Sequence, residues 1–211
     1  MTTLRIGITG PIGCGKSTVA RWLAERPGIE VIDADAVARE VLAPGTPETA
    51  AVYRRFGSEL AGADGSLDRA ALGRVVFADP AALRDLEAIV HPAVRPRIIA
   101  AVAAATGRGA LAVVIEAIKL VEGGLAELCD EVWLVRCDPA VQRDRLLGRG
   151  TDVADAEGRI AAQGDLVARL APAATRILDA TGDPARTRSL AQAALDEAMT
   201  TANRRSPGPS H

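Results

Sequence analysis

The stretch "GITGPIGCGKSTVA", residues 7–20, decides the fold of this chain. It fits the pattern GxxxxGKS, with its glycines at Gly10 and Gly15, and this pattern binds nucleotide phosphates. Glycines let the backbone turn its N–H groups inward around phosphate oxygens. Lys16 then reaches the β- and γ-phosphates, and the Ser17 hydroxyl ligates Mg²⁺.

The sequence on both sides of the loop has the context that this pattern requires. Residues 4–9 read as a short buried strand, and residues 16–26 as a helix with Val19 and Leu23 on one face. The probability that this pattern occurs by chance in a chain of this length is on the order of one per cent. We therefore expect the loop and the N-terminus of the helix to bind the phosphates of ATP or GTP, together with Mg²⁺. The predicted contacts are Gly10, Pro11, Ile12, Gly13, Cys14, Gly15, Lys16, Ser17 and Thr18.

Composition and charge narrow the class of protein. The chain has 211 residues, 48% of them hydrophobic, and a formal net charge of −2. This length suits one domain with a substantial insertion, and the charge argues against a dedicated nucleic-acid binder. The N-terminus has no signal-like pattern, and the apolar runs are too short to span a bilayer. These features predict a soluble, cytoplasmic protein that binds no membrane.

The three cysteines, Cys14, Cys129 and Cys137, form no CxxC pair and have no partnering histidine cluster. A zinc site is therefore not expected. An odd number of cysteines in a chain without a signal peptide predicts free thiols in a reducing compartment. We interpret the thiol of Cys14 as incidental, because the backbone of the loop is what binds phosphate.

Alternating strands and helices predict an α/β fold with a parallel sheet covered on both faces. The expected strands span residues 4–9, 30–33, 110–116, 131–137 and 174–179. Between the second and third strands we expect consecutive helices over 36–42, 46–56, 67–77, 79–90 and 91–105. Later helices are expected over 139–149 and 159–163, and Asp183-Pro184 begins a long C-terminal helix. The last four helices before the third strand are more than a simple crossover needs, so they indicate a helical insertion.

The rest of the chain distinguishes among proteins that share this loop. A signalling GTPase would carry NKxD after a later strand, and none is present. "DATG" at residues 179–182 matches DxxG but ends the last predicted strand, where that motif does not belong. Motor and transporter ATPases are usually larger. A small-molecule kinase needs an acceptor site, a base and cationic residues around the phosphates.

A base candidate lies in "VIDADAVA", residues 31–38. A right-handed crossover places the end of the second strand, at Asp33, on the same sheet edge as the phosphate loop. A carboxylate there can take the proton of an acceptor hydroxyl or orient that hydroxyl. The alternative is that Asp33 and Asp35 only cap the following helix. We assign the cap to Asp35 and the base to Asp33.

Cationic candidates lie in "QRDRLLGRG", residues 142–150. Arg145 and Arg149 are four residues apart on one helix face, and Arg143 is nearby. Arginines stabilise the charge of a transferring phosphoryl group. The alternative is a solvated helix face, the usual setting of such residues. Because a glycine-containing loop follows, the segment also suits a mobile lid that excludes water.

The phosphate loop, the base candidate and the arginines together resemble the dephospho-coenzyme A kinase family. The resemblance covers nearly the whole chain, with its motifs in the same order. The phosphate loop is joined by "VIDADAVAREVLAPG" (31–45), by Phe56-Gly57 and by "DGSLDRAALGRVVFADPAALRDLEAIVHPAV" (64–94). Gln142, Arg145, Leu146 and Arg149 follow, then "RIAAQ" (159–163) and "ILDATGDPARTR" (177–188).

The resemblance implies a P-loop NTPase-type three-layer sandwich with a five-stranded parallel sheet, similar to adenylate kinase. It implies a nucleotide-binding core over 1–43, 107–139 and 166–203, and a helical acceptor-binding (CoA) domain over 44–106. A lid over 140–165 and a disordered tail over 204–211 complete the expected organisation. The implied activity is ATP-dependent phosphorylation of the ribose 3′-hydroxyl of dephospho-CoA, the last step of coenzyme A biosynthesis.

Site residues follow from the same resemblance. Asp33, Lys16, Arg145 and Arg149 are implied as catalytic, and Asp33, Asp35, His91, Arg95 and Gln163 as substrate-binding. Ser17 and Glu116 are implied to hold Mg²⁺, directly or through water. His91 is also open to a structural reading, as a helix cap before Pro92. The expected partners are ATP and dephospho-CoA, with a monomer or weak homo-oligomer.

One block departs from the family pattern. Where the family reads like "DIPLLFE", this chain has "EAIKLVE" at residues 116–122. Glu116 keeps the carboxylate, but Ile118 replaces the proline and Lys119 adds a charge. Arg149-Gly150 replaces a usual "RD". Lys119 either meets an acceptor phosphate or extends to solvent. Two alternatives therefore stay open: a related P-loop kinase for a nucleoside, nucleotide or other small hydroxyl acceptor, and a nucleotide-binding module without transfer activity.

Overall fold

The structure, a computed structural model, describes residues 2–205. The chain divides into two compact units. One contains the chain up to Ile32 and from Val102 onward, and the other contains Asp33–Ala101. The sequence placed the insertion at 44–106, whereas the helical unit begins at Asp33 because α2 (Ala34–Val41) belongs to it.

The first unit is built on a five-stranded sheet with the order β2-β3-β1-β4-β5. The strands are β1 (Leu4–Thr9), β2 (Ile29–Asp33), β3 (Ala112–Glu116), β4 (Glu131–Arg136) and β5 (Arg176–Asp179). β1 lies in the middle and pairs in parallel with β3 and β4, and β4 pairs in parallel with β5. All five residues of β3 are buried, as expected for a sheet covered on both faces. The predicted α/β fold with five strands is confirmed.

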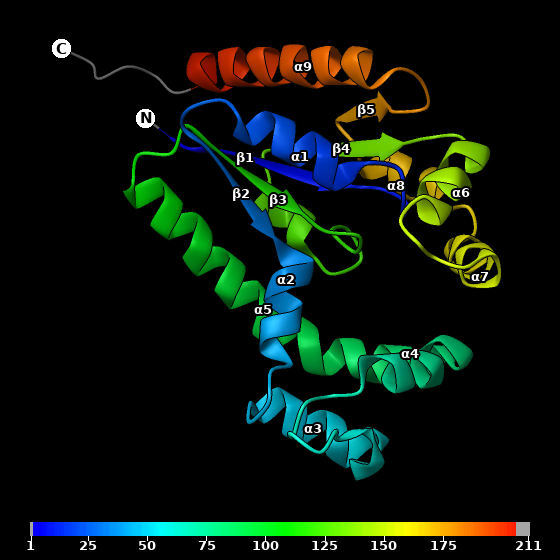
Figure 1. Cartoon of the computed structure of the whole chain (residues 1–211). Helices are drawn as coiled ribbons and strands as arrows, with labels where there is room; N and C mark the ends of the chain where they lie inside the picture. The colour runs from blue at the N-terminus through cyan, green and yellow to red at the C-terminus, as the bar shows by residue number, and fades with distance from the viewer. Residues whose placement is uncertain (1, 206–211) are drawn as a thin grey trace. The chain divides into compact units, whose positions relative to one another are not determined.

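Helices cover both faces of this sheet, which gives three layers. α1 (Lys16–Ala24) and α9 (Pro184–Arg205) pack together on one face (Figure 1). Their core includes the fully buried side chains of Leu23, Trp133 and Leu195. On the other face, Leu166 and Leu170 of α8 (Leu166–Leu170) pack against β4. Each fully buried leucine contributes roughly 1.5–3 kcal/mol to stability.

The segment between β4 and α8 contains α6 (Pro139–Leu147) and α7 (Val153–Gln163). α7 begins six residues before the predicted 159, because Asp152 caps it by accepting a 2.9 Å bond from the Asp155 N–H. Short 3₁₀ helices span Leu125–Leu128 and Ala171–Ala173. α9 continues to Arg205, so the disordered tail predicted from 204 is wrong for 204 and 205. The remainder of that prediction, 206–211, lies outside the described residues.

The helical unit contains α2, α3 (Pro47–Phe56), a 3₁₀ turn (Ser58–Leu60), α4 (Arg69–Ala78) and most of α5 (Pro80–Gly107). Its core is formed by Leu42, Val52, Leu60, Leu67, Leu72, Val76 and Ala82. The prediction of separate helices over 79–90 and 91–105 is wrong, because α5 runs through Pro92 and Pro96 without a break. A proline removes one N–H from a helix and can bend it, yet the helix continues on both sides of these two residues.

α5 is long and apolar enough, by length and composition, to cross a membrane, and about a fifth of its most apolar window is buried (22%). A core helix of a soluble protein passes the same test. Arg95 and Arg97 lie near its midpoint, where a charge is costly in hydrocarbon.

Candidate active site

The phosphate loop joins β1 to α1, and three of its glycines have the left-handed backbone that favours glycine. The φ angles are +141° at Gly10, +78° at Gly13 and +98° at Gly15. Gly10 also has no room for a side chain, since a Cβ there would lie 2.0 Å from the Val135 carbonyl oxygen. The loop can therefore lie directly against the end of β4 only because this residue is glycine.

Lys16 is buried within this loop, with 6% of its surface exposed. Its Nζ donates hydrogen bonds to the carbonyl oxygens of Gly10 (2.9 Å) and Pro11 (3.0 Å). A buried ammonium group at the N-terminus of α1 adds a full positive charge to the partial charge of the helix dipole. This combination forms an anion-binding site suited to phosphate.

Ser17 and Glu116 bring two oxygen ligands together beside the loop. The Ser17 Oγ donates a 2.5 Å hydrogen bond to Glu116 Oε1, from the last residue of β3. Among residues 2–205, no group of three or more His, Cys, Asp or Glu side chains could hold a metal ion. Mg²⁺ usually takes only one or two protein oxygens and completes its shell with water and phosphate. The Ser17–Glu116 pair therefore fits Mg²⁺ held together with a nucleotide.

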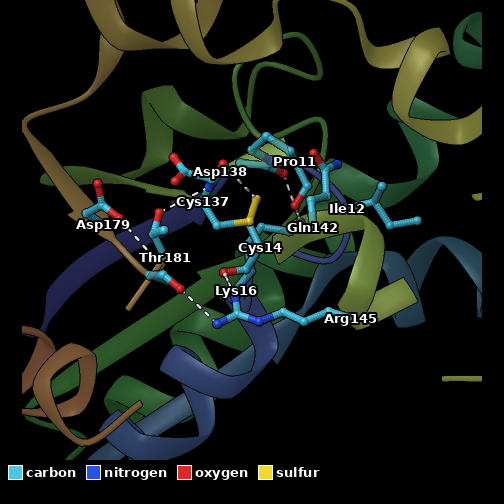
Figure 2. The surroundings of a disulfide bond; sticks show 12 residues. Pro11, Ile12, Cys14, Lys16, Cys137, Asp138, Gln142, Arg145, Asp179 and Thr181 are labelled. Carbon is cyan, nitrogen blue, oxygen red and sulfur yellow. Dashed lines mark hydrogen bonds between the residues drawn. A yellow bond between two sulfur atoms is a disulfide. The ribbon is translucent and has the colours of Figure 1, made fainter. Parts of the chain in front are cut away.

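Arg145 on α6 connects the loop to the turn after β5 (Figure 2). Its guanidinium donates to the carbonyl oxygens of Cys14 (3.3 Å) and Ala180 (2.8 Å). Next to it lies a hollow of about 230 Å³ lined by Gly15, Thr18, Val19, Trp22, Arg145, Arg149, Ala180, Pro184 and Thr187. Arg149 is exposed at this hollow, so the two predicted arginines border the same space beside the phosphate loop. Arg143 instead pairs with Glu157 of α7.

Gln163, predicted to contact the acceptor, lies at the end of α7 and bonds to the loop itself. Its Oε1 accepts from the Ile12 N–H at 3.0 Å and from Gln142 Nε2 at 3.4 Å. These bonds attach the segment that was predicted to be a lid to the backbone of the phosphate loop. Gln142, whose role the sequence did not predict, is buried beneath this contact.

In the helical unit, Asp33 caps α2. Its Oδ1 accepts from the Ala36 N–H at 2.9 Å, and its Oδ2 lies 3.3 Å from the Arg39 guanidinium. The assignment of the cap to Asp35 is wrong, because Asp35 lies two residues after the N-cap, within the first turn of the helix. Asp33 nevertheless keeps about half of its side chain exposed (47%), so its carboxylate remains open to a ligand.

His91 and Arg95 lie on α5, four residues apart and therefore on one face of the helix. Both side chains are half-buried. His91 is inside a continuous helix, so the reading of this residue as a helix cap is wrong.

The cysteines differ from the prediction. Cys14 and Cys137 form a disulfide between the phosphate loop and the end of β4, with their Cα atoms 5.2 Å apart (Figure 2). The expectation of three free thiols is wrong for this pair, because β1 and β4 are neighbours in the sheet and their ends meet. Only Cys129 is free among the cysteines, and burial raises the pKa of its thiol to about 12.

The turn after β5 is a part of the site that the sequence did not identify. Asp179 Oδ1 accepts from the Thr181 N–H at 2.9 Å, and its Oδ2 pairs with Arg136 at 2.9 Å. The bond from the Thr181 backbone is the main reason that the pKa of Asp179 is lowered. This arrangement presents the Ala180 carbonyl to Arg145. The "DATG" stretch lies in a block of the family resemblance, but the sequence predicts no site residue in it.

A parallel sheet with this loop at its centre, the Ser17–Glu116 oxygen pair and arginines beside the loop define a P-loop kinase of small molecules. Comparison with known proteins gives the particular family. The dephospho-CoA kinase family model, CoaE, matches residues 4–184. The chain belongs to the dephospho-CoA kinase family.

Relatives and solved structures agree with this membership. A dephospho-CoA kinase of Symbiobacterium thermophilum is 48% identical over 190 residues, covering 90% of this chain and 79% of the relative. The crystal structure of TT1252 from Thermus thermophilus superposes with a TM-score of 0.73 and 34% identity, over 93% of this chain and 98% of that one. Dephospho-CoA kinase from Campylobacter jejuni has the same fold, with a TM-score of 0.67 at 23% identity, over 95% of this chain and 100% of that one.

Proposed function

We propose that this chain transfers the γ-phosphoryl group of ATP to the ribose 3′-hydroxyl of dephospho-CoA and so forms coenzyme A. The observation that carries the proposal is the phosphate loop with buried Lys16 and the Ser17–Glu116 pair, in a chain of the dephospho-CoA kinase family.

The donor half of the site lies within the first unit. The backbone N–H groups of residues 13–18 and the Lys16 ammonium bind the triphosphate. The hollow beside Arg145, walled by Trp22 and Pro184, receives the base and ribose. Arg145 and Arg149 supply positive charge next to the transferring group, where pre-positioned cations stabilise developing charge.

Ser17 and Glu116 would hold Mg²⁺. Both side chains offer oxygen, and their 2.5 Å contact shows that they reach a common point. When bound, the ion neutralises charge between the phosphate groups.

The acceptor half uses residues of the helical unit. Asp33 takes the proton of the 3′-hydroxyl as its oxygen attacks phosphorus, or orients that hydroxyl. Asp35, His91 and Arg95 of the same unit contact the acceptor, and we also propose an acceptor contact for Gln163 of the first unit.

One specific observation favours a second candidate, a related P-loop kinase for another hydroxyl acceptor. The segment after β3 reads "EAIKLVE", with Lys119 half-buried three residues beyond Glu116. The experiment that separates the candidates is ADP release measured with dephospho-CoA and then with a panel of nucleosides and nucleotides. Turnover with a nucleoside alone would overturn the first proposal, and no acceptor-dependent turnover would favour a binding module.

We further infer that the enzyme is soluble and cytoplasmic, acts as a monomer or weak homo-oligomer, and binds neither nucleic acid nor membrane. The net charge of −2 and the charged midpoint of α5 support this inference.

A further inference from the structure

The Cys14–Cys137 bond connects two parts of the donor site that are distant in sequence. Cys14 is the central residue between Gly13 and Gly15 of the phosphate loop, and 123 positions separate it from Cys137. Cys137 lies two residues before Pro139, the first residue of α6. Because α6 carries Arg145, the bond joins the loop to the base of the arginine-bearing helix.

The two sulfur atoms differ in access. Cys14 is fully buried, at 0% exposure. Cys137 is half-buried and lines a cavity of about 320 Å³, together with Pro11, Gln163, Asp165, Asp179 and Thr181. The cavity therefore gives a small nucleophile a route to Cys137, whereas Cys14 is fully buried.

The surroundings of Cys14 also make it the better leaving group. It lies two residues before Lys16, where α1 begins, and positive charge at a helix N-terminus stabilises a thiolate. The free Cys129 offers neither property. It lies away from the loop, half-buried, and burial raises the pKa of its thiol to about 12.

We propose that Cys14 and Cys137 form a reversible thiol–disulfide exchange site, at which low-molecular-weight thiols and disulfides set the ATP affinity of the phosphate loop. A thiolate attacks the Cys137 Sγ, forms a mixed disulfide with it and breaks the bond to Cys14, which leaves as a thiolate and takes a proton from water. A second thiolate attacks the outer sulfur of the mixed disulfide. It releases Cys137 as a thiolate and forms the small-molecule disulfide. Oxidation by such a disulfide runs through the same steps in reverse.

The link to ATP affinity rests on the nucleotide-binding part of the proposed function. In the disulfide form the loop is fixed to the base of α6, and the Cys14 carbonyl accepts from Arg145. After reduction, the loop without ATP can adopt more conformations. ATP binding must then order the loop, and the lost conformational entropy weakens binding. Ordering costs of this kind predict that the reduced enzyme binds ATP about 3- to 10-fold more weakly than the oxidised enzyme.

The test measures ATP binding by calorimetry in the absence of acceptor, because dephospho-CoA is itself a thiol and would reduce the bond during turnover. The full chain is equilibrated in oxidised and in reduced glutathione, and mass spectrometry after alkylation records the state of each cysteine. We expect the Kd for ATP to rise 3- to 10-fold on reduction. Cys137→Ser should remove this response, and the matched control Cys129→Ser should retain it.

The site of attack is tested separately. With Cys14→Ser, oxidised glutathione should form a mixed disulfide on Cys137, whereas with Cys137→Ser it should form none on Cys14. Equal ATP affinity in both redox states, or an adduct on Cys14, overturns the exchange site. Failure of the wild type to bind ATP in either redox state would instead refute the donor half of the proposed function.

Discussion

Ser17 and Glu116 are 99 residues apart in the chain, yet the Ser17 hydroxyl donates a 2.5 Å hydrogen bond to the Glu116 carboxylate. β1 and β3 are parallel neighbours, and Ile8 is in register with Glu116. The helix that starts at Lys16 and the strand that ends at Glu116 therefore meet at one edge of the sheet, where their oxygens fit Mg²⁺.

Glu116→Gln tests this pair as a magnesium site. The amide keeps the size of the side chain and can still contact Ser17, but it removes the negative charge. We expect the Mg²⁺ concentration for half-maximal activity to rise roughly 10- to 100-fold. ADP release measured across a magnesium titration checks this, and chelation with EDTA should abolish wild-type activity. An unchanged titration would argue against Glu116 as a ligand.

Asp33→Asn separates the chemistry of Asp33 from its capping role. Asparagine caps a helix about as well as aspartate, so α2 should persist while the base is lost. We expect kcat to fall by roughly 10²–10⁴ with ATP binding retained. The control is Asp35→Asn in the first turn of the same helix, which should lower kcat much less. A near-normal kcat for Asp33→Asn would refute the general base.

Arg145→Lys tests the bridge between the phosphate loop and the β5–α9 turn. An ammonium group cannot reproduce the planar fork that reaches both the Cys14 and Ala180 carbonyls. Loss of one hydrogen bond to a charged group predicts an increase of about tenfold in the KM for ATP. Arg149→Lys is the matched comparison. The Arg149 side chain is exposed, so this substitution should affect ATP binding less. Steady-state kinetics with varied ATP measure both.

Gly10→Ala tests the close approach of the loop to β4. The new methyl group meets the Val135 carbonyl and sits on a backbone that disfavours any side chain. We expect a loss of stability of roughly 1–3 kcal/mol together with weakened ATP binding. Gly109→Ala provides the control. The φ angle of Gly109 is +84°, and a Cβ there would have no atom within 4 Å, so this variant measures backbone strain alone. Urea unfolding of the two variants should show the greater loss at Gly10.

Asp179→Asn tests the pH dependence of the turn after β5. Because the pKa of Asp179 is lowered from its ordinary 3.8, its ionised form stabilises the fold above that value. This stabilisation is lost as the pH falls through the lower, folded-state pKa. Wild type should therefore be more stable than Asp179→Asn at pH 6, and the difference should shrink toward pH 3. Urea midpoints at the two pH values measure it, and a constant difference would contradict the assignment.

The fold was predictable because its signals are local. The glycine spacing of residues 10–17 requires a strand before it and a helix after it, and both have the predicted hydrophobic pattern. α5 was not predicted as one helix, because Pro92 and Pro96 are ordinary stop signals, and only tertiary packing decides that a helix continues through them.

The site was predictable only in part, for a different reason. Lys16 and Ser17 belong to a contiguous motif, whereas the Cys14–Cys137 bond and the Arg145 contact with Ala180 join residues distant in sequence. Sequence spacing carries no information about such contacts until the strand order is known. The wrong assignment of the cap to Asp35 has a smaller cause, since either aspartate could cap a helix whose first residue was misplaced by two.

The central position of β1 has a consequence for synthesis on the ribosome. The strand is made before both of its partners, which begin at Ala112 and Glu131, so its first residues emerge more than a hundred residues ahead of either. At a translation rate of about 5–20 residues per second, β1 and the phosphate loop have no partner strand for several seconds after they are made. The nucleotide site can therefore form only after the helical unit, β3 and β4 have been made, although its defining motif is translated before all of them.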